Sequence, residues 1–175
     1  MKKKLETAYG VIGLGRFGEA LAMMLAQSGN EVIAVDRDEK KVKEMRQYTD
    51  CAFVTDDLST ETLREIGIQN CDVVIICIGE QVDVSVLTTM RVIEMGVSRV
   101  IAKALSPEQG AVLGKLGAEV VYPERDMALR LGKKLLSNNF LEYVSLCNQV
   151  EIRQIQVPNH LIGKSIEETG IRQKY

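Results

Sequence analysis

Short apolar runs alternate with amphipathic stretches from residue 8 to residue 136, and this alternation constrains the fold more than any other feature of the sequence. The apolar runs lie at 8–12, 31–36, 52–54, 72–78, 99–102 and 119–122, and a stretch with helical periodicity follows each of them. Strands that alternate with helices pair in parallel, because each helix returns the chain to the same edge of the sheet. The sequence therefore predicts an α/β fold, a doubly wound parallel sheet with helices on both faces.

The pattern changes after residue 136, which suggests a domain boundary there. A short apolar stretch follows at 140–146, and residues 151–157 alternate in the manner of an antiparallel strand. A chain of 175 residues supports one sizeable core and a short appendage. We expect a domain at 1–136 and, at 137–175, a linker and a short α+β appendage. The appendage is too small to close a core, so it is either truncated or packs on a partner.

Composition excludes several classes of function. The formal net charge is -2 and the basic residues form no stripe, so a nucleic-acid partner is not expected. No apolar run has the length of a membrane span. The four cysteines lack zinc-site spacing; Cys71 and Cys77 lie in or beside an apolar run and are expected to be buried thiols. A reducing, cytosolic compartment fits this usage.

The strongest motif is a glycine-rich turn between the first predicted strand and the first predicted helix, Gly13-Leu14-Gly15-Arg16-Phe17-Gly18. In that context Gly13 permits the tight turn, Gly15 lets the backbone approach a phosphate, and Gly18 lets the helix sit close to the strand. The helix N-terminus then faces the phosphate with its free amides and positive dipole end. The motif predicts a nucleotide-binding sheet of the Rossmann type.

Asp36 ends the second predicted strand, where this fingerprint places an acid that binds ribose hydroxyls. NAD, ATP, ADP and AMP all offer that ribose, whereas the 2′-phosphate of NADP would meet like charge, although the neighbouring Arg37 leaves NADP open. Arg16 either neutralises a terminal phosphate or forms a surface salt bridge.

Several residues just beyond other strands are expected at the same edge of the sheet. Asp56 and Asp57 either contact the base or simply start the next helix, and Lys103, just past the fifth strand, is a candidate for contact with phosphate. Gly79 and Glu80 follow the fourth strand. The residues expected to contact the nucleotide are Gly13, Gly15, Arg16, Phe17, Gly18, Asp36, Arg37, Asp56, Asp57, Ile78, Gly79, Glu80 and Lys103.

No residue arrangement indicates catalysis. The single histidine, His160, lies in the appendage, and no Tyr-x-x-x-Lys, P-loop or Cys/His cluster is present. A sheet that binds a nucleotide without groups to transform it fits a sensor better than an enzyme. A redox sensor for NAD(H) and a small NAD-dependent oxidoreductase remain alternatives.

The chain resembles the RCK (TrkA-N, KTN) family of potassium-transport regulators, and within it the regulatory subunits of bacterial Ktr uptake systems. The resemblance rests on the residues 9–18, 35–36, 72–79, 87–90, 101–104, 116–118 and 122–127, the last of which reads Tyr-Pro-Glu-Arg-Asp-Met. Residues 150–175 look like the start of the family's C-terminal lobe.

The resemblance implies a regulator that is not an enzyme. Its Rossmann domains would dimerise and assemble into a ring, typically an octamer, beneath a membrane-embedded potassium channel or transporter subunit, on the inner face of the cell membrane. Exchange of ATP and ADP, or of NAD and NADH, would change the ring's shape. Arg16 matches the family arginine that reaches the terminal phosphate. Glu124 matches an acid that helps hold Mg²⁺ or Ca²⁺ beside the triphosphate; without the family, it would be a helix N-terminal acid.

Overall fold

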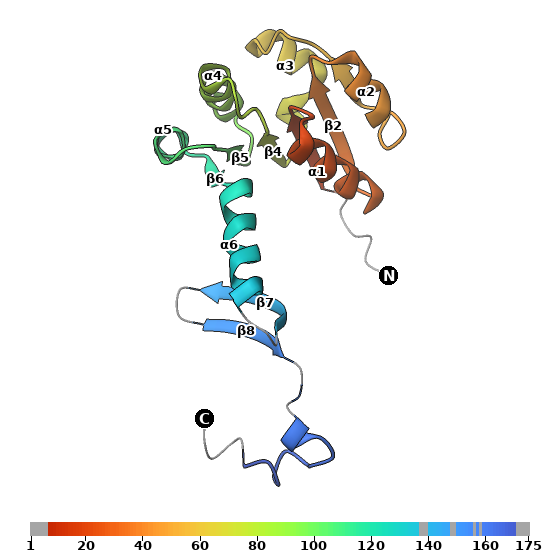
Figure 1. Cartoon of the computed structure of the whole chain (residues 1–175). Helices are drawn as coiled ribbons and strands as arrows, with labels where there is room; N and C mark the ends of the chain where they lie inside the picture. The colour runs from red at the N-terminus through yellow and green to blue at the C-terminus, as the bar shows by residue number, and fades with distance from the viewer. Residues whose placement is uncertain (1–6, 137–139, 148–149, 156, 158, 171–175) are drawn as a thin grey trace. The chain divides into compact units, whose positions relative to one another are not determined.

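The structure is a computed structural model that describes residues 7–136, 140–147, 150–155, 157 and 159–170 (Figure 1). Contacts divide the chain into two compact units, Met1–Glu124 and Arg125–Tyr175. The domain boundary expected after residue 136 stays a prediction.

A single six-stranded parallel sheet organises the first unit. Its strands are β1 (Ala8–Ile12), β2 (Glu31–Asp36), β3 (Ala52–Val54), β4 (Val73–Ile76), β5 (Arg99–Lys103) and β6 (Glu119–Val121). Their spatial order is β3-β2-β1-β4-β5-β6, and all five neighbouring pairs are parallel. The predicted doubly wound α/β fold is confirmed. The order reverses between β1 and β4, which is where ligands bind in open sheets of this kind.

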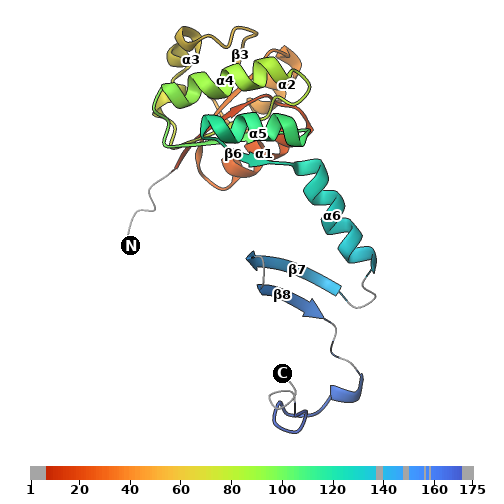
Figure 2. The same ribbon diagram turned by 90° about the vertical axis from the view of Figure 1, so that its left-hand side faces the viewer.

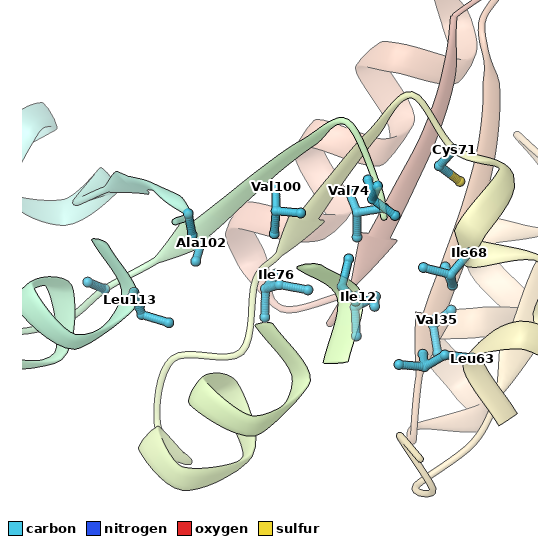
Figure 3. Packing of buried hydrophobic residues seen from close by; sticks show 14 residues of the cluster. Ile12, Val35, Leu63, Ile68, Cys71, Val74, Ile76, Val100, Ala102 and Leu113 are labelled. Atoms are coloured by element: carbon cyan, nitrogen blue, oxygen red, sulfur yellow. The ribbon is translucent and has the colours of Figure 1, made fainter. Parts of the chain in front are cut away.

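Helices cover both faces of the sheet and define two hydrophobic cores. On one face, α1 (Arg16–Gln27) and α2 (Glu39–Met45) bury Ala22, Val42 and Met45 against alternate strand residues such as Val11. On the other, α3 (Thr60–Ile66), α4 (Val82–Glu94) and α5 (Pro107–Leu116) pack over the residues drawn in Figure 3. Figure 2 shows α4 and α5 side by side. A short 3-10 turn, η1 (Ile68–Asn70), follows α3.

Burial of apolar side chains stabilises this unit. Ile12, Leu14 and Ile76 are almost wholly buried, and each buried side chain of this size contributes about 1.5–3 kcal/mol. Cys71 and Cys77 are buried as predicted. Burial raises the pKa of the Cys71 thiol to about 11 and that of Cys77 to about 12, so both stay protonated at neutral pH.

Side-chain caps fix where helices α2 and α3 begin. The Asp38 carboxylate accepts from the Lys40 amide at 3.0 Å ahead of α2, and the Ser59 hydroxyl accepts from the Thr62 amide ahead of α3. These bonds satisfy amides that have no partner within the helix. Because each helix directly follows the carboxyl end of a strand, its cap also sets the loop at that edge of the sheet.

The second unit contains most of α6 (Pro123–Leu136) and an antiparallel pair, β7 (Phe140–Cys147) and β8 (Val150–Ile155). A 3-10 turn, η2 (Asn159–Leu161), follows. Helix α6 starts at Pro123, because proline fits the first helical position, where its missing N–H costs nothing. None of the helices in the described part of the chain is long and apolar enough to cross a membrane.

Candidate functional site

The glycine turn has the geometry that its sequence predicts. Gly13 follows β1 with a φ of +99°, a region that favours glycine, and its amide donates to the Val35 carbonyl at 2.7 Å. A Cβ at Gly18 would collide with the Gly13 carbonyl oxygen, so only glycine fits there. A Cβ at Gly15 would meet nothing within 4 Å. The turn is tightly packed at Gly13 and Gly18 and open at Gly15, which leaves space over its backbone.

This open space adjoins the N-terminus of α1. Gly15 is the N-cap residue of α1 and has no side chain to bond the first amides of the helix. Those N–H groups therefore remain for water or for an anion, which the helix dipole also favours. Arg16, the first helical residue, is exposed and adds a positive charge. Phe17 is half-buried and packs into the core beneath α1 and α2, so its contribution is to seat the helix.

Asp36 connects the end of β2 to the glycine turn. Its Oδ2 accepts from the Leu14 amide at 2.5 Å and its Oδ1 accepts from the Asp38 amide at 2.8 Å. The side chain is 9% exposed, and the Lys41 ammonium lies 3.7 Å away. A carboxylate has about four acceptor positions, so these two bonds leave capacity for ribose hydroxyls. Sequence reasoning missed the bond to Leu14, because an amide carries no residue-specific signal.

The loops after β2 and β4 approach each other across the end of β1. The Arg37 guanidinium lies 3.5 Å from the Gln81 side-chain oxygen, and both side chains are exposed. Ile78 is half-buried, and its backbone amide lies close to the position that a Cβ on Gly13 would take. Arg37 and Ile78 therefore lie beside the glycine turn, on the two sides of the point where the strand order reverses.

Gly79 and Glu80 differ in how they meet the rest of this edge. A Cβ on Gly79 would lie 3.2 Å from the Leu105 side chain, so Gly79 admits Leu105 beside it. Glu80 is exposed. Glycine at 79 thus has a packing reason of its own, and contact between either residue and a nucleotide stays a prediction.

Asp56 and Asp57 occupy different environments although they are adjacent. Asp57 Oδ1 accepts from the Ser59 amide, and Oδ2 accepts from the hydroxyls of Ser59 and Thr62. These hydrogen bonds, the one from Thr62 foremost, lower the pKa of Asp57. Both side chains are exposed. The hydrogen bonds of Asp57 support the start of helix α3, one of its two predicted roles, so Asp56 is the better placed of the two for an external ligand.

Lys103 and Glu124 form an ion pair, with Nζ 2.6 Å from Oε1. The Lys103 side chain is 13% exposed and that of Glu124 58%. The hydrogen bond from Lys103 lowers the pKa of Glu124, with a smaller effect from the charge of Arg16. The fold thus brings together the glycine turn, the end of β5 and the first turn of α6. The positive charges of Lys103 and Arg16 both act on the Glu124 carboxylate.

A divalent cation beside Glu124 would need phosphate oxygens among its ligands. Among the residues that the structure describes, no three histidine, cysteine, aspartate or glutamate side chains are grouped as metal ligands. A single exposed carboxylate such as Glu124 fits the way Mg²⁺ is bound, with one or two carboxylates completed by phosphate oxygens and water. The donor set therefore fits a metal that accompanies a nucleotide.

Known proteins match the chain over nearly its whole length. Residues 9–123 match the TrkA-N domain. The Ktr system potassium uptake protein C of Bacillus subtilis (strain 168) is 39% identical over 176 aligned residues, which cover 100% of this chain and 78% of that protein.

Solved structures share the fold. The GsuK structure bound to ADP is 27% identical, with a TM-score of 0.61, and the match covers 74% of this chain and 34% of that one. The GsuK channel bound to NAD is 25% identical, with a TM-score of 0.63, over 78% of this chain and 24% of that one. The motif, the sheet order and these matches agree: the chain belongs to the TrkA-N domain family.

Proposed function

We propose that this chain is a nucleotide-sensing regulatory subunit of a potassium channel or transporter, and that ATP and ADP compete for its glycine turn. The observation that carries the proposal is the open backbone at Gly15, followed directly by the cation of Arg16, whose charge acts on Glu124, the partner of Lys103. Its relatives support the transport role, because one is named a potassium uptake protein, and the solved structures include GsuK bound to ADP and the GsuK channel bound to NAD. The cytoplasmic face of the membrane is the compartment this role requires.

The charges at the turn favour the more anionic nucleotide. The α1 amides and the dipole of α1 suit the phosphates nearest the ribose. Arg16 and Lys103 then offer charge-assisted hydrogen bonds to the phosphate furthest from the ribose. ADP lacks that phosphate, so the two nucleotides differ in their contacts with these side chains. A ligand shifts a conformational equilibrium only through such differential affinity.

Glu124 has two possible partners in this mechanism. In the structure it accepts from Lys103. We propose that phosphate draws Lys103 toward itself and frees the Glu124 carboxylate to hold Mg²⁺ or Ca²⁺ beside the triphosphate. When bound, that cation would neutralise phosphate charge. Because Glu124 lies in the first turn of α6, its change of partner is transmitted along the helix into the second unit.

The membrane subunit would sense this change through an assembly of these chains. We propose that the domains form dimers and a ring, and that two ring shapes differ in their affinity for ATP. The coupling free energy is then the difference between the free energies with which ATP binds the two ring shapes.

The Arg16→Ala variant tests the sensing step. We expect its affinity for ATP to fall roughly ten- to hundredfold relative to wild type, the equivalent of about 1.5–3 kcal/mol for a charged hydrogen bond. Its affinity for ADP should change little, so the ATP/ADP ratio collapses. Arg64→Ala, on the exposed side of α3, is the matched control. An unchanged ratio in Arg16→Ala would rule out Arg16 as the sensor of the terminal phosphate.

An NAD(H) sensor is the second candidate, because one related channel structure holds NAD. It predicts NADH bound more tightly than ATP and no effect of Mg²⁺. A small oxidoreductase would instead consume NADH in the presence of carbonyl substrates. The absorbance of NADH, followed over time, separates the two functions: it stays constant with a sensor and falls with an oxidoreductase.

A further inference from the structure

Arg91 joins helix α4 to the segment between β3 and α3. Its Nη1 donates to the Leu58 carbonyl oxygen at 2.8 Å, although the two residues lie on opposite sides of the reversal in strand order. Arg91 is half-buried, and the Leu58 side chain packs against the core beneath α3, α4 and α5. Segment 55–59 is therefore anchored twice at Leu58, by its backbone and by its side chain.

A second set of contacts fixes the same segment from within. Asp57 accepts from the Ser59 amide and hydroxyl, each at 2.9 Å, and from the Thr62 hydroxyl. The charge of Arg91 also acts favourably on the Asp57 carboxylate. These bonds commit both carboxylate oxygens of Asp57 to the first turn of α3. Both acids are exposed, and the neighbouring Asp56 is the one that these bonds leave for an external ligand.

The anchored segment starts beside the ribose candidate. The Thr55 amide donates to the Asp36 carbonyl oxygen at 3.1 Å, and Val54 pairs with Asp36 in the sheet. A nucleotide with its phosphates at the glycine turn and its ribose at Asp36 would extend its base toward this side of the sheet. Asp56 is then the acidic side chain next to the base.

We infer that Arg91 is a positioning residue for base recognition, which holds segment 55–59 so that Asp56 accepts a hydrogen bond from the exocyclic amino group of adenine. This inference rests on the proposed binding of nucleotide at the glycine turn. A carboxylate placed at the 6-substituent of the base favours adenine, whose N6 donates, and disfavours guanine, whose O6 is an acceptor. Discrimination between the two bases thus depends on a residue that touches neither.

Titration calorimetry of the whole chain with ATP, GTP and inorganic tripolyphosphate tests the inference. Arg91→Met should lower ATP affinity about tenfold, because the freed segment must be ordered on binding at about 1–2 kcal/mol per residue. Affinity for tripolyphosphate should stay at the wild-type value, since that ligand has no base. Arg91→Lys, which keeps one donor, should recover part of the ATP affinity. Arg99→Met, which loses only an exposed pair with Glu119, is the control.

A second variant keeps the test decisive if Arg91→Met folds poorly. Asp57→Asn weakens the same segment from within and should lower ATP affinity without changing that for tripolyphosphate. If the ratio of ATP affinity to GTP affinity in Arg91→Met or Asp57→Asn equals that of wild type, this inference is overturned while the proposed function stands. An equal loss of affinity for all three ligands, which marks a general structural role, would also overturn it. A wild-type chain that binds neither ATP nor ADP would overturn the proposed function, and the inference with it.

Discussion

At the scale of single residues, Asp36 links the two halves of the proposed nucleotide site. Its carboxylate accepts from Leu14 in the glycine turn and from Asp38 at the start of α2. Buried acceptors of this kind hold a backbone more firmly than neutral ones, because the hydrogen bonds are charge-assisted. The acid that the motif predicts for ribose therefore also holds the turn predicted to face phosphate, so the proposed recognition of ribose and of phosphate would depend on one side chain.

Gly15→Asp tests the glycine turn itself. The variant should fold, since a Cβ at this position meets no atom within 4 Å and the φ of -72° suits any residue. Its carboxylate would occupy the phosphate space and repel the ligand, so we expect ATP binding to be lost in calorimetry. Ala111→Asp adds the same charge on the exposed side of α5 and serves as the control. ATP affinity in Gly15→Asp equal to that of the control would contradict the assignment.

Glu124 gives the stability of the chain a small dependence on pH. Lys103 holds the pKa of Glu124 below its ordinary value of 4.5, so the ion pair stabilises the fold at neutral pH. That contribution is present above 4.5 and is lost as the pH falls through the lowered pKa of the folded state. The group is 58% exposed, so solvent screening limits the contribution to about 0.5 kcal/mol.

The Glu124→Gln variant makes this contribution measurable. Its free energy of unfolding by denaturant should lie about 0.5 kcal/mol below wild type at pH 7. The difference should shrink as the pH falls below 4.5, where the wild-type carboxyl also loses its charge. A difference that stays constant between pH 7 and pH 3 would show that the pair contributes no charge interaction. Glu61→Gln, an exposed position on α3, controls for the loss of one acid.

At the scale of elements, α5 begins with a reciprocal cap. The Ser106 hydroxyl accepts from the Gln109 amide at 3.2 Å, and the Gln109 side chain accepts from the Leu105 amide at 2.9 Å. Leu105 in turn lies beside Gly79 at the edge of the nucleotide site. The cap of α5 therefore fixes one wall of that edge as well as the helix.

Ser106→Ala should lower the free energy of unfolding by about 1 kcal/mol, the usual cost of losing an N-cap side chain. Thermal or denaturant unfolding measures this change, with the exposed Ser98→Ala as the control. A variant as stable as wild type would show that the Ser106 hydroxyl is not a stabilising cap. The free energy of nucleotide binding should change by less than the free energy of unfolding. Ser106 only adjoins Leu105, and it is Leu105 that lies beside Gly79.

Elements were predictable from sequence where their signal is local. Apolar runs and helical periodicity identify all six strands of the sheet, and the glycine motif identifies the turn. The start of α6 at Pro123 has a weaker local signal, because proline breaks a helix except in its first turn. The contact from Arg91 to Leu58 joins residues 33 positions apart in sequence. Only the packing of α4 over the sheet determines it, so no sequence pattern indicates it.

At the scale of the whole molecule, the first unit holds the proposed nucleotide site, and α6 begins in that unit and continues in the second. Beyond Glu124, α6 carries exposed apolar side chains at Met127, Leu131 and Leu135, which recur on one side of the helix. Exposed apolar surface of this kind indicates a contact with another protein surface. It is consistent with the proposed assembly, in which a change at Glu124 reaches neighbouring chains through α6.

The most direct test of a triphosphate sensor is calorimetric titration of the nucleotide-free protein with ATP, ADP and NADH, each with and without Mg²⁺. We predict that ATP binds more tightly than ADP or NADH, and that Mg²⁺ strengthens ATP binding in wild type but not in Glu124→Gln. NADH bound most tightly, with no effect of Mg²⁺, would contradict the account and favour a redox sensor.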